Sequence, residues 1–402
     1  MLLKSGRRFG PKPGPFTRLF APAVTHVLDR IDEGLVSGTL HGTLPDGQTR
    51  TLGGNAPGFE CEVIVHDWRA LLRLATGGSV GWYQAWEAGE WSSPDPVPLF
   101  ALFMANAVSL GDAARAKGPW RLVARAMHAM QRNTREGAAK NIHAHYDLGN
   151  DFYAAWLDPT MTYSSGLGWG EDGLEAAQRR KLARMAERIG EAQSVLDIGC
   201  GWGSLAGYLA VEGRDVTGIS ISRNQLTWAR QRHSGVDFCE CDYRDMDGRF
   251  DAITSVEMVE ALGREYWPAF MDCLARNLKP CGRAAIQYIS IAEPIFESYA
   301  SSADFIQAYV FPGGCLISTS EFRRLAEERG LQWTDQQDFG LDYAETLKCW
   351  RERFELAVEE GRLPVDFDSR FCNLWRFYLM YCEGGFRGGG IDVHQVTLIK
   401  DA

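Results

Sequence analysis

The sequence predicts an α/β protein in which helices cover both faces of a parallel sheet, preceded by a smaller α+β domain. From Ser194 onward, five apolar runs alternate with helical segments, and such alternation is typical of a parallel sheet between two layers of helices. Residues 37 to 66 instead alternate and turn with no helix between the runs, as paired strands do. Because 402 residues exceed the usual length of one domain, we expect domains over 1–125 and 126–402.

The strands of the large sheet are visible as apolar runs, and the segments between them are helical in pattern. The five runs are 194–200, 215–221, 236–242, 250–258 and 283–291. The helical segments include 204–213, 222–233 and 266–278. Two further stretches, 331–340 and 391–400, supply a sixth and a seventh strand, the last one terminal. A ligand of such a sheet binds at the carboxyl ends of its strands.

The composition is that of a folded protein. Hydrophobic residues make up 45% and charged residues 23%, which is far from the disordered regime. The net charge of −10 argues against nucleic acid as a partner. No apolar run reaches the ~20 residues of a membrane-spanning helix, and no secretory signal opens the chain, so we expect a cytoplasmic protein. The ten cysteines show no metal-ligand spacing, so we predict no metal site.

Basic residues gather in two segments, one near the start of the sequence and one that crosses the predicted boundary between the domains. No acidic residue precedes Asp29, and between Arg115 and Lys140 seven basic residues are opposed only by Glu136. The second segment also carries apolar residues at roughly helical spacing: Trp120, Leu122, Val123, Met127 and Met130. A basic amphipathic helix suits an anionic membrane surface, although a solvated linker helix explains the pattern equally well. We expect peripheral association with the inner face of the membrane.

A glycine turn follows the first strand of the large sheet. It reads Asp197-Ile198-Gly199-Cys200-Gly201-Trp202-Gly203, which is GxGxG and not the GxGxxG of dinucleotide sites. Glycine lets the backbone approach a ligand closely, but a tight turn into a helix needs glycine in any case. Asp197 would repel a pyrophosphate, whereas it suits the cationic or polar groups of a nucleoside amino acid. The turn therefore favours S-adenosylmethionine (AdoMet).

The next two strand ends agree with this ligand. The stretch VTGISIS ends the second strand, where ribose hydroxyls are commonly bound. The stretch CDYRDM follows the third strand, and we expect Asp242 to accept from the adenine amine and Tyr243 to lie against the adenine ring. Motifs suited to AdoMet thus follow three successive strands in the expected order. A purely structural role therefore does not explain the glycines.

Seven motifs extend the pattern in consistent order over roughly 140–400. They are HYDLGNDFYAAWLDPTMTYSS, VLDIGCGWG, GISISRNQ, DYRD, VEMVEALG, YVFPGGCL and DFGLDYAETLKCW. Together they resemble the family of cyclopropane-fatty-acyl-phospholipid synthases and mycolic-acid methyltransferases. The resemblance implies a Rossmann-like, seven-stranded class I AdoMet-dependent methyltransferase domain behind a lipid-associated accessory domain. It also implies that the insertion at 292–320 helps to wall an acyl channel, and that the protein is a homodimer.

The resemblance also assigns residues to the AdoMet site. The implied contacts are Tyr163, Ser164, Gly199, Gly201, Ser220, Ile221, Gln225 and Tyr243. Asp197, Gly203 and Asp242 join them from the glycine turn and the third strand end. For Tyr163 and Ser164 the alternative is a helix-capping turn after LDPTM.

A bicarbonate site is implied as well, and here the chain departs from the family. Family members hold the ion with a cysteine, a histidine, a tyrosine and a network linked to a glutamate. Tyr343 matches the tyrosine and Glu260 the glutamate, but Ser165 replaces the cysteine and Gln287 the histidine. Neither replacement can become cationic, and an anion at a dry site prefers a positive partner. We therefore expect bicarbonate to be weakly held or absent.

The departures predict how the reaction ends. Transfer of the sulfonium methyl to one alkene carbon leaves a cation on the next, which aromatic faces stabilise. Removal of a proton from the new methyl closes a cyclopropane, whereas removal from a neighbouring chain carbon leaves a methylated alkene. We expect Glu260 to be the base, with its pKa raised by burial; the alternative is a satisfied structural carboxylate.

We therefore predict methylation at the double bond of unsaturated acyl chains in membrane phospholipids, giving a methyl-branched or methylene product. The substrate is a monoene or a conjugated diene of the kind that leads to furan fatty acids. Ordinary cyclopropane synthesis with an altered anion site is the first alternative. The others are a catalytically silent, membrane-bound AdoMet-binding protein and methylation of nitrogen or oxygen on a small metabolite, because one fold serves many substrates.

Overall fold

The computed structural model describes residues 21–111, 148–302 and 304–402. The chain divides into two compact units, Met1–Ala124 and Arg125–Ala402. Both basic segments expected at a membrane surface, the one before Asp29 largely and the one between Arg115 and Lys140 wholly, lie outside the described residues. Within the described ranges, no helix has both the length and the apolar character needed to cross a membrane.

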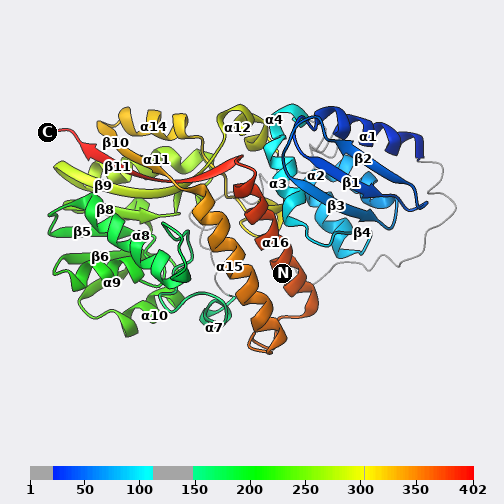
Figure 1. Cartoon of the computed structure of the whole chain (residues 1–402). Coiled ribbons are helices and arrows are strands. Elements are labelled where there is room, and N and C mark those ends of the chain that lie inside the picture. Colours follow the sequence, from blue (N-terminus) through cyan, green and yellow to red (C-terminus); the bar gives the residue numbers. More distant parts are fainter. Residues whose placement is uncertain (1–20, 112–147, 303) are drawn as a thin grey trace. The chain divides into compact units, whose positions relative to one another are not determined.

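The first unit is built on a four-stranded sheet (Figure 1). Its strand order is β2 (Thr49–Gly53), β1 (Thr39–Thr43), β3 (Glu60–Val65) and β4 (Trp91–Ser92). The sheet is mixed, because β1 is antiparallel to β2 and parallel to β3. Among its described residues, the helices of this unit are α1 (Ala21–Gly34), α2 (Arg69–Glu87), α3 (Val97–Ala105) and α4 (Ala107–Leu110). This arrangement is the small α+β domain that the sequence predicts.

One buried amide joins the segments of the first unit. The Asn106 side chain accepts from the backbone N–H groups of Val36 at 2.9 Å and of Ser37 at 3.1 Å. It donates to the carbonyl oxygens of Ser37 at 2.9 Å and of Leu102 at 2.8 Å. Asn106 is buried, so water cannot replace these four bonds, and the side chain holds the turn after α1 against the end of α3.

Replacing this amide should destabilise the first unit. Asn106→Ala leaves the backbone groups of Val36 and Ser37 without partners, and we expect a loss of about 3 kcal/mol in the free energy of opening. Hydrogen exchange at residues 26–65 measures it. Asn55→Ala is the control, because Asn55 is exposed and makes one long bond of 3.4 Å to the carbonyl of Leu35; it should cost less than about 0.5 kcal/mol. Equal losses would contradict the structural role of Asn106.

The second unit contains a seven-stranded sheet, as the sequence predicts. Its strand order is β10 (Leu331–Asp338), β11 (Ile391–Lys400), β9 (Leu278–Ile291), β8 (Phe250–Val256), β5 (Ser194–Ile198), β6 (Asp215–Ser220) and β7 (Val236–Glu240). The five strands β9, β8, β5, β6 and β7 are parallel to one another. All five apolar runs and both further stretches form strands, and the α/β fold class is confirmed.

The sheet is not parallel throughout, which corrects the prediction at one strand. β11 runs antiparallel to both β9 and β10. The reason is the helical hairpin between β10 and β11, formed by α15 (Gly340–Glu359) and α16 (Ser369–Arg387), which lie side by side (Figure 1). Ion pairs from Arg387 to Glu345 and from Arg376 to Glu355 show that the two helices are antiparallel. The chain enters the hairpin at the carboxyl end of β10, and the hairpin returns it to the same end of the sheet. The next strand, β11, must therefore run antiparallel to β10.

Helices cover both faces of this sheet. Apolar side chains of α8 (Gly173–Ile189), α9 (Ser204–Val211) and α10 (Arg223–Arg232) pack with β5, β6 and β7 in one hydrophobic cluster. Its members include Leu182, Met185, Leu205, Leu209 and Leu226. α11 (Trp267–Asn277) and α14 (Thr319–Glu327) pack with each other, and Figure 1 shows α14 across the sheet from α8. The remaining helices are α7 (Asn150–Ala154), α12 (Glu293–Ala300) and α13 (Phe305–Tyr309), with short 3₁₀ turns at Tyr243–Asp245, Val259–Ala261 and Arg264–Tyr266.

Candidate active site

A cavity lies at the carboxyl ends of the parallel strands β5, β6, β7 and β8. Residues that directly follow these strands form its wall, joined by 161–164 from the chain before the sheet and by Phe311, Pro312 and Gly314 from the predicted insertion. Ten residues predicted for AdoMet line it: Tyr163, Ser164, Asp197, Gly199, Gly201, Ser220, Ile221, Gln225, Asp242 and Tyr243. Because this sheet edge is where parallel folds bind ligands, the cavity is the candidate AdoMet site.

The three glycines of the turn serve different purposes. Gly199, Gly201 and Gly203 have φ angles of 75°, 54° and 86°, which L side chains rarely adopt. A Cβ atom on Gly203 would lie 2.7 Å from the Phe238 ring, so this glycine is required by packing, and it does not line the cavity. A Cβ atom on Gly201 would meet no atom within 4 Å, so Gly201 presents bare backbone where a ligand approaches.

The polar residues of the cavity are partly engaged by the protein. Asp197 is buried and accepts from the Thr254 hydroxyl at 2.8 Å, and burial raises its pKa to about 7. Asp242 accepts from the backbone N–H of Arg244 at 3.0 Å and from its guanidinium at 2.9 Å. The Tyr243 ring meets Phe270 edge-on, with centroids 5.9 Å apart. The adenine contacts of Asp242 and Tyr243 stay predictions, but both side chains lie at the cavity.

Alanine at the two glycines should separate ligand binding from folding. Gly201→Ala places a methyl group in the cavity and costs about 1 kcal/mol at its positive φ, so we expect AdoMet affinity to fall at least about tenfold with a small loss of stability. Gly203→Ala drives a methyl group into Phe238 and should mainly lower Tm. Calorimetric titration with AdoMet and thermal unfolding without it measure the two effects. A Gly201→Ala variant with unchanged affinity would refute the ligand-facing role.

Three of the four residues predicted for catalysis surround one carboxylate, which the sequence did not single out. It belongs to Glu257, directly after β8, and it lines the cavity. The Ser165 backbone N–H donates to Glu257 Oε1 at 3.0 Å, and Gln287 Nε2 donates to the same oxygen at 2.8 Å. The Tyr343 hydroxyl donates to Oε2 at 2.6 Å. The expected serine contact is thus corrected, because the Ser165 hydroxyl donates to the carbonyl of Gly166 at 2.7 Å and only its backbone reaches the carboxylate.

Lys181 places a positive charge near Glu257, and this residue too was not identified from the sequence. Its side chain is buried on α8, lines the cavity and donates to the Ser164 hydroxyl at 2.6 Å. Burial lowers the pKa of Lys181 to about 8, against the attraction of Glu257 and Asp158. Burial raises the pKa of Glu257, whereas the bonds from Tyr343 and Ser165, the charge of Lys181 and the Gln287 bond lower it. These contacts favour the ionised carboxylate, but burial has the larger effect and the pKa of Glu257 is raised overall.

Glu260 lies beside this cluster and takes no bond from Ser165, Gln287 or Tyr343 among the described contacts. Its Oε1 accepts from the backbone N–H of Ile289, and its Oε2 is buried with no partner in the described parts of the chain. Burial, and after it the charge of Glu257, raise the pKa of Glu260 to about 8. Burial thus raises the pKa of both acids in VEMVE, but three donors and Lys181 oppose the rise at Glu257. The position of Glu257 at the end of a predicted strand is the sequence signal that could have identified it.

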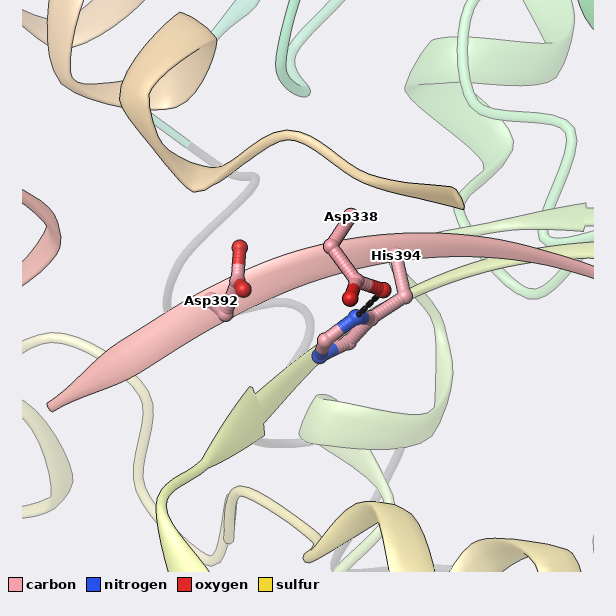
Figure 2. A group of neighbouring side chains, drawn as sticks. All are labelled: Asp338, Asp392 and His394. Atoms are coloured by element: carbon pink, nitrogen blue, oxygen red, sulfur yellow. Dashed lines mark hydrogen bonds and ion pairs between the residues drawn. The ribbon is translucent and has the colours of Figure 1, made fainter. Parts of the chain in front are cut away.

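A second group of ligand-type side chains lies outside the cavity lining, at the β9, β10 and β11 edge (Figure 2). His394 is buried, with Nδ1 2.7 Å from Asp338 Oδ1 and Nε2 2.6 Å from the Ser290 hydroxyl. Asp392 accepts from the backbone N–H of Val393 at 2.8 Å. Because both imidazole nitrogens have partners, hydrogen bonding between the three strands accounts for the group.

Comparison with known proteins agrees with this geometry. The family model for mycolic acid cyclopropane synthetase matches residues 133–396. The chain belongs to this family. Like other members of the mycolic acid cyclopropane synthetase family, it is an AdoMet-dependent methyltransferase with AdoMet as its cofactor, so the catalytically silent alternative is wrong.

Relatives and solved structures extend the likeness. The chain is 36% identical over 370 residues to tuberculostearic acid methyltransferase UfaA1 of Mycobacterium tuberculosis, covering 84% of this chain and 83% of that protein. It is 36% identical over 261 residues to cyclopropane-fatty-acyl-phospholipid synthase of Escherichia coli, covering 64% and 66%. The structure of mycolic acid cyclopropane synthase CmaA1 with SAH and CTAB superposes with a TM-score of 0.59 at 28% identity, covering 65% of this chain and 98% of that one. The cyclopropane synthase MmaA2 of M. tuberculosis gives 0.60 at 26%, with the same coverage.

Proposed function

We propose that this enzyme methylates the double bond of unsaturated acyl chains in membrane phospholipids and releases a methyl-branched or methylene product. The observation that carries the proposal is the bonding of Glu257. The positions that the family resemblance assigned to a bicarbonate ion, 165, 287 and 343, instead hold a carboxylate of the protein. A base is thus built into the chain, and no added anion is needed.

The residues present suit the reaction. When bound, AdoMet supplies the methyl group that adds to one alkene carbon and leaves a positive charge on the next. Glu257 then takes a proton from a neighbouring carbon, and the electrons of that C–H bond form the new double bond. The Tyr163 hydroxyl lies 2.8 Å from that of Tyr378, whose ring meets Phe311 edge-on. These aromatic faces provide an apolar path for a lipid tail and stabilise the cation.

The methyl or methylene product is preferred over a cyclopropane because the relative named as a methyltransferase matches 84% of this chain, against 64% for the cyclopropane synthase at the same identity. We further propose that the enzyme meets its substrate at the membrane surface, which the basic sequence between Arg115 and Lys140 supports.

Liposome assays test the function. We expect transfer of labelled methyl groups to phospholipids with monoenoic or dienoic chains and none to saturated lipids or to water-soluble amines and alcohols. NMR of the released fatty acids should show new olefinic or methyl-branch signals, whereas cyclopropane ring protons near the methyl region would contradict the proposed product. Sedimentation with anionic liposomes at low and high salt tests the membrane contact, which should weaken as salt rises.

Removing the carboxylate of Glu257 should stop the chemistry and spare the cofactor. We expect Glu257→Gln to lower kcat by about 10²–10⁴-fold, the usual contribution of a positioned base, with AdoMet affinity within about threefold of wild type. Glu260→Gln is the matched control at the neighbouring acid and should cost less than about tenfold, since Glu260 takes no bond from Ser165, Gln287 or Tyr343. If only Glu260→Gln abolished turnover, the base would be Glu260.

A further inference from the structure

A relay of hydrogen bonds leads from Glu257 through Gln287 and Gln395 to Arg188, a buried arginine on α8. Gln287 Nε2 donates to Glu257 at 2.8 Å, and Gln287 Oε1 accepts from Gln395 Nε2 at 2.9 Å. Gln395 Oε1 in turn accepts from Arg188 Nε at 3.1 Å. Both glutamines and Arg188 are buried, and they come from β9, β11 and α8. None of the three lines the cavity.

Arg188 determines the donor-to-acceptor direction of this relay. A guanidinium donates and cannot accept, so Gln395 must turn its oxygen to Arg188 and its NH₂ group to Gln287. Gln287 must then present its own oxygen to Gln395, which leaves its NH₂ group facing Glu257. Glu257, at the other end of the relay, requires the same direction, because an ionised carboxylate can only accept hydrogen bonds.

Arg188 is held in place by contacts independent of the glutamines. Its Nη1 donates to the Thr397 hydroxyl at 3.2 Å and pairs with the Asp335 carboxylate at 3.0 Å. Burial lowers the pKa of Arg188 to about 10, while Asp335 opposes the change, so the side chain stays charged at neutral pH. Because Arg188 stays charged and in place, it determines the donor-to-acceptor direction of the relay.

We propose that Arg188 is a positioning residue which, through Gln395 and Gln287, keeps a hydrogen-bond donor on Glu257 and so holds this carboxylate ionised for proton removal. The proposal rests on the function proposed above. The other titratable groups facing Glu257 are Lys181 from α8, Glu260 from the turn after β8 and Tyr343 from α15. Of these, Lys181 and Tyr343 favour the ionised form and Glu260 opposes it when charged.

Gln395→Glu tests the direction of the chain with a side chain of the same shape. A glutamate there accepts from Arg188 and must also accept from Gln287, so Gln287 turns its NH₂ group away and its oxygen toward Glu257. Glu257 loses a donor and faces a second oxygen, which raises its pKa. We expect the acidic limb of the kcat–pH profile to move up by about one pH unit or more. Activity at neutral pH should fall about tenfold and recover at higher pH.

Two further comparisons separate this effect from general damage. Glu187→Gln also removes a charge near Arg188, but Glu187 is exposed and pairs with Arg184 at 3.2 Å. It makes no hydrogen bond to Arg188, Gln395 or Gln287 among the described contacts, so the pH profile should not move. Arg188→Lys keeps a side chain that only donates and should shift the profile less than Arg188→Met. AdoMet affinity and Tm of Gln395→Glu should match those of wild type.

An infrared titration gives a readout that does not depend on turnover. The band of protonated Glu257, assigned from its absence in Glu257→Gln, should titrate at higher pH in Gln395→Glu than in wild type. An unmoved band, or a kcat lowered equally at all pH values, would overturn the role of Arg188. A wild-type enzyme inactive on every unsaturated phospholipid, with the band shifted as expected, would instead overturn the proposed function and leave the relay standing.

Discussion

The carboxylate of Glu257 is the point on which the site depends. Taking a charged group out of water is costly unless donors and an opposite charge replace the solvent. Here a backbone N–H, an amide and a phenol provide the bonds, at 3.0, 2.8 and 2.6 Å, and Lys181 provides the charge. These donors come from residues 165, 287 and 343, so the carboxylate has all its partners only when the loop before the sheet, β9 and the helical hairpin have assembled.

The two neighbouring acids divide the chemistry between them. Glu257 has three donors and a nearby cation, whereas Glu260 has one backbone donor, a buried oxygen without a partner in the described chain and a pKa raised to about 8. Burial raises the pKa of both acids, and the donors and Lys181 oppose the rise at Glu257. Glu257 is therefore the acid that its contacts help to ionise, as the proposed function requires.

The expected cofactor site is assembled, while the expected anion site is altered. The glycine turn and the strand ends line the cavity, and the solved relatives share the fold. The change lies where serine and glutamine stand in place of the cysteine and histidine that the resemblance led us to expect. The chain compensates from within: Gln287 supplies a donor whose direction is determined by a cation two side chains further away.

The sequence by itself determined the elements that depend on local pattern. Five apolar runs and two further stretches became the seven strands, and ten residues chosen from strand ends and motifs line one cavity, because β periodicity and the edge of a parallel sheet follow from neighbours along the chain. Only the tertiary structure decided the reversed strand β11, the backbone contact of Ser165, the three donors on Glu257 and the hydrogen bonds that lead from Arg188 to Gln287. Each of these depends on groups 30 or more residues apart meeting at hydrogen-bond distance, and side-chain donors and acceptors leave no periodic trace in the sequence.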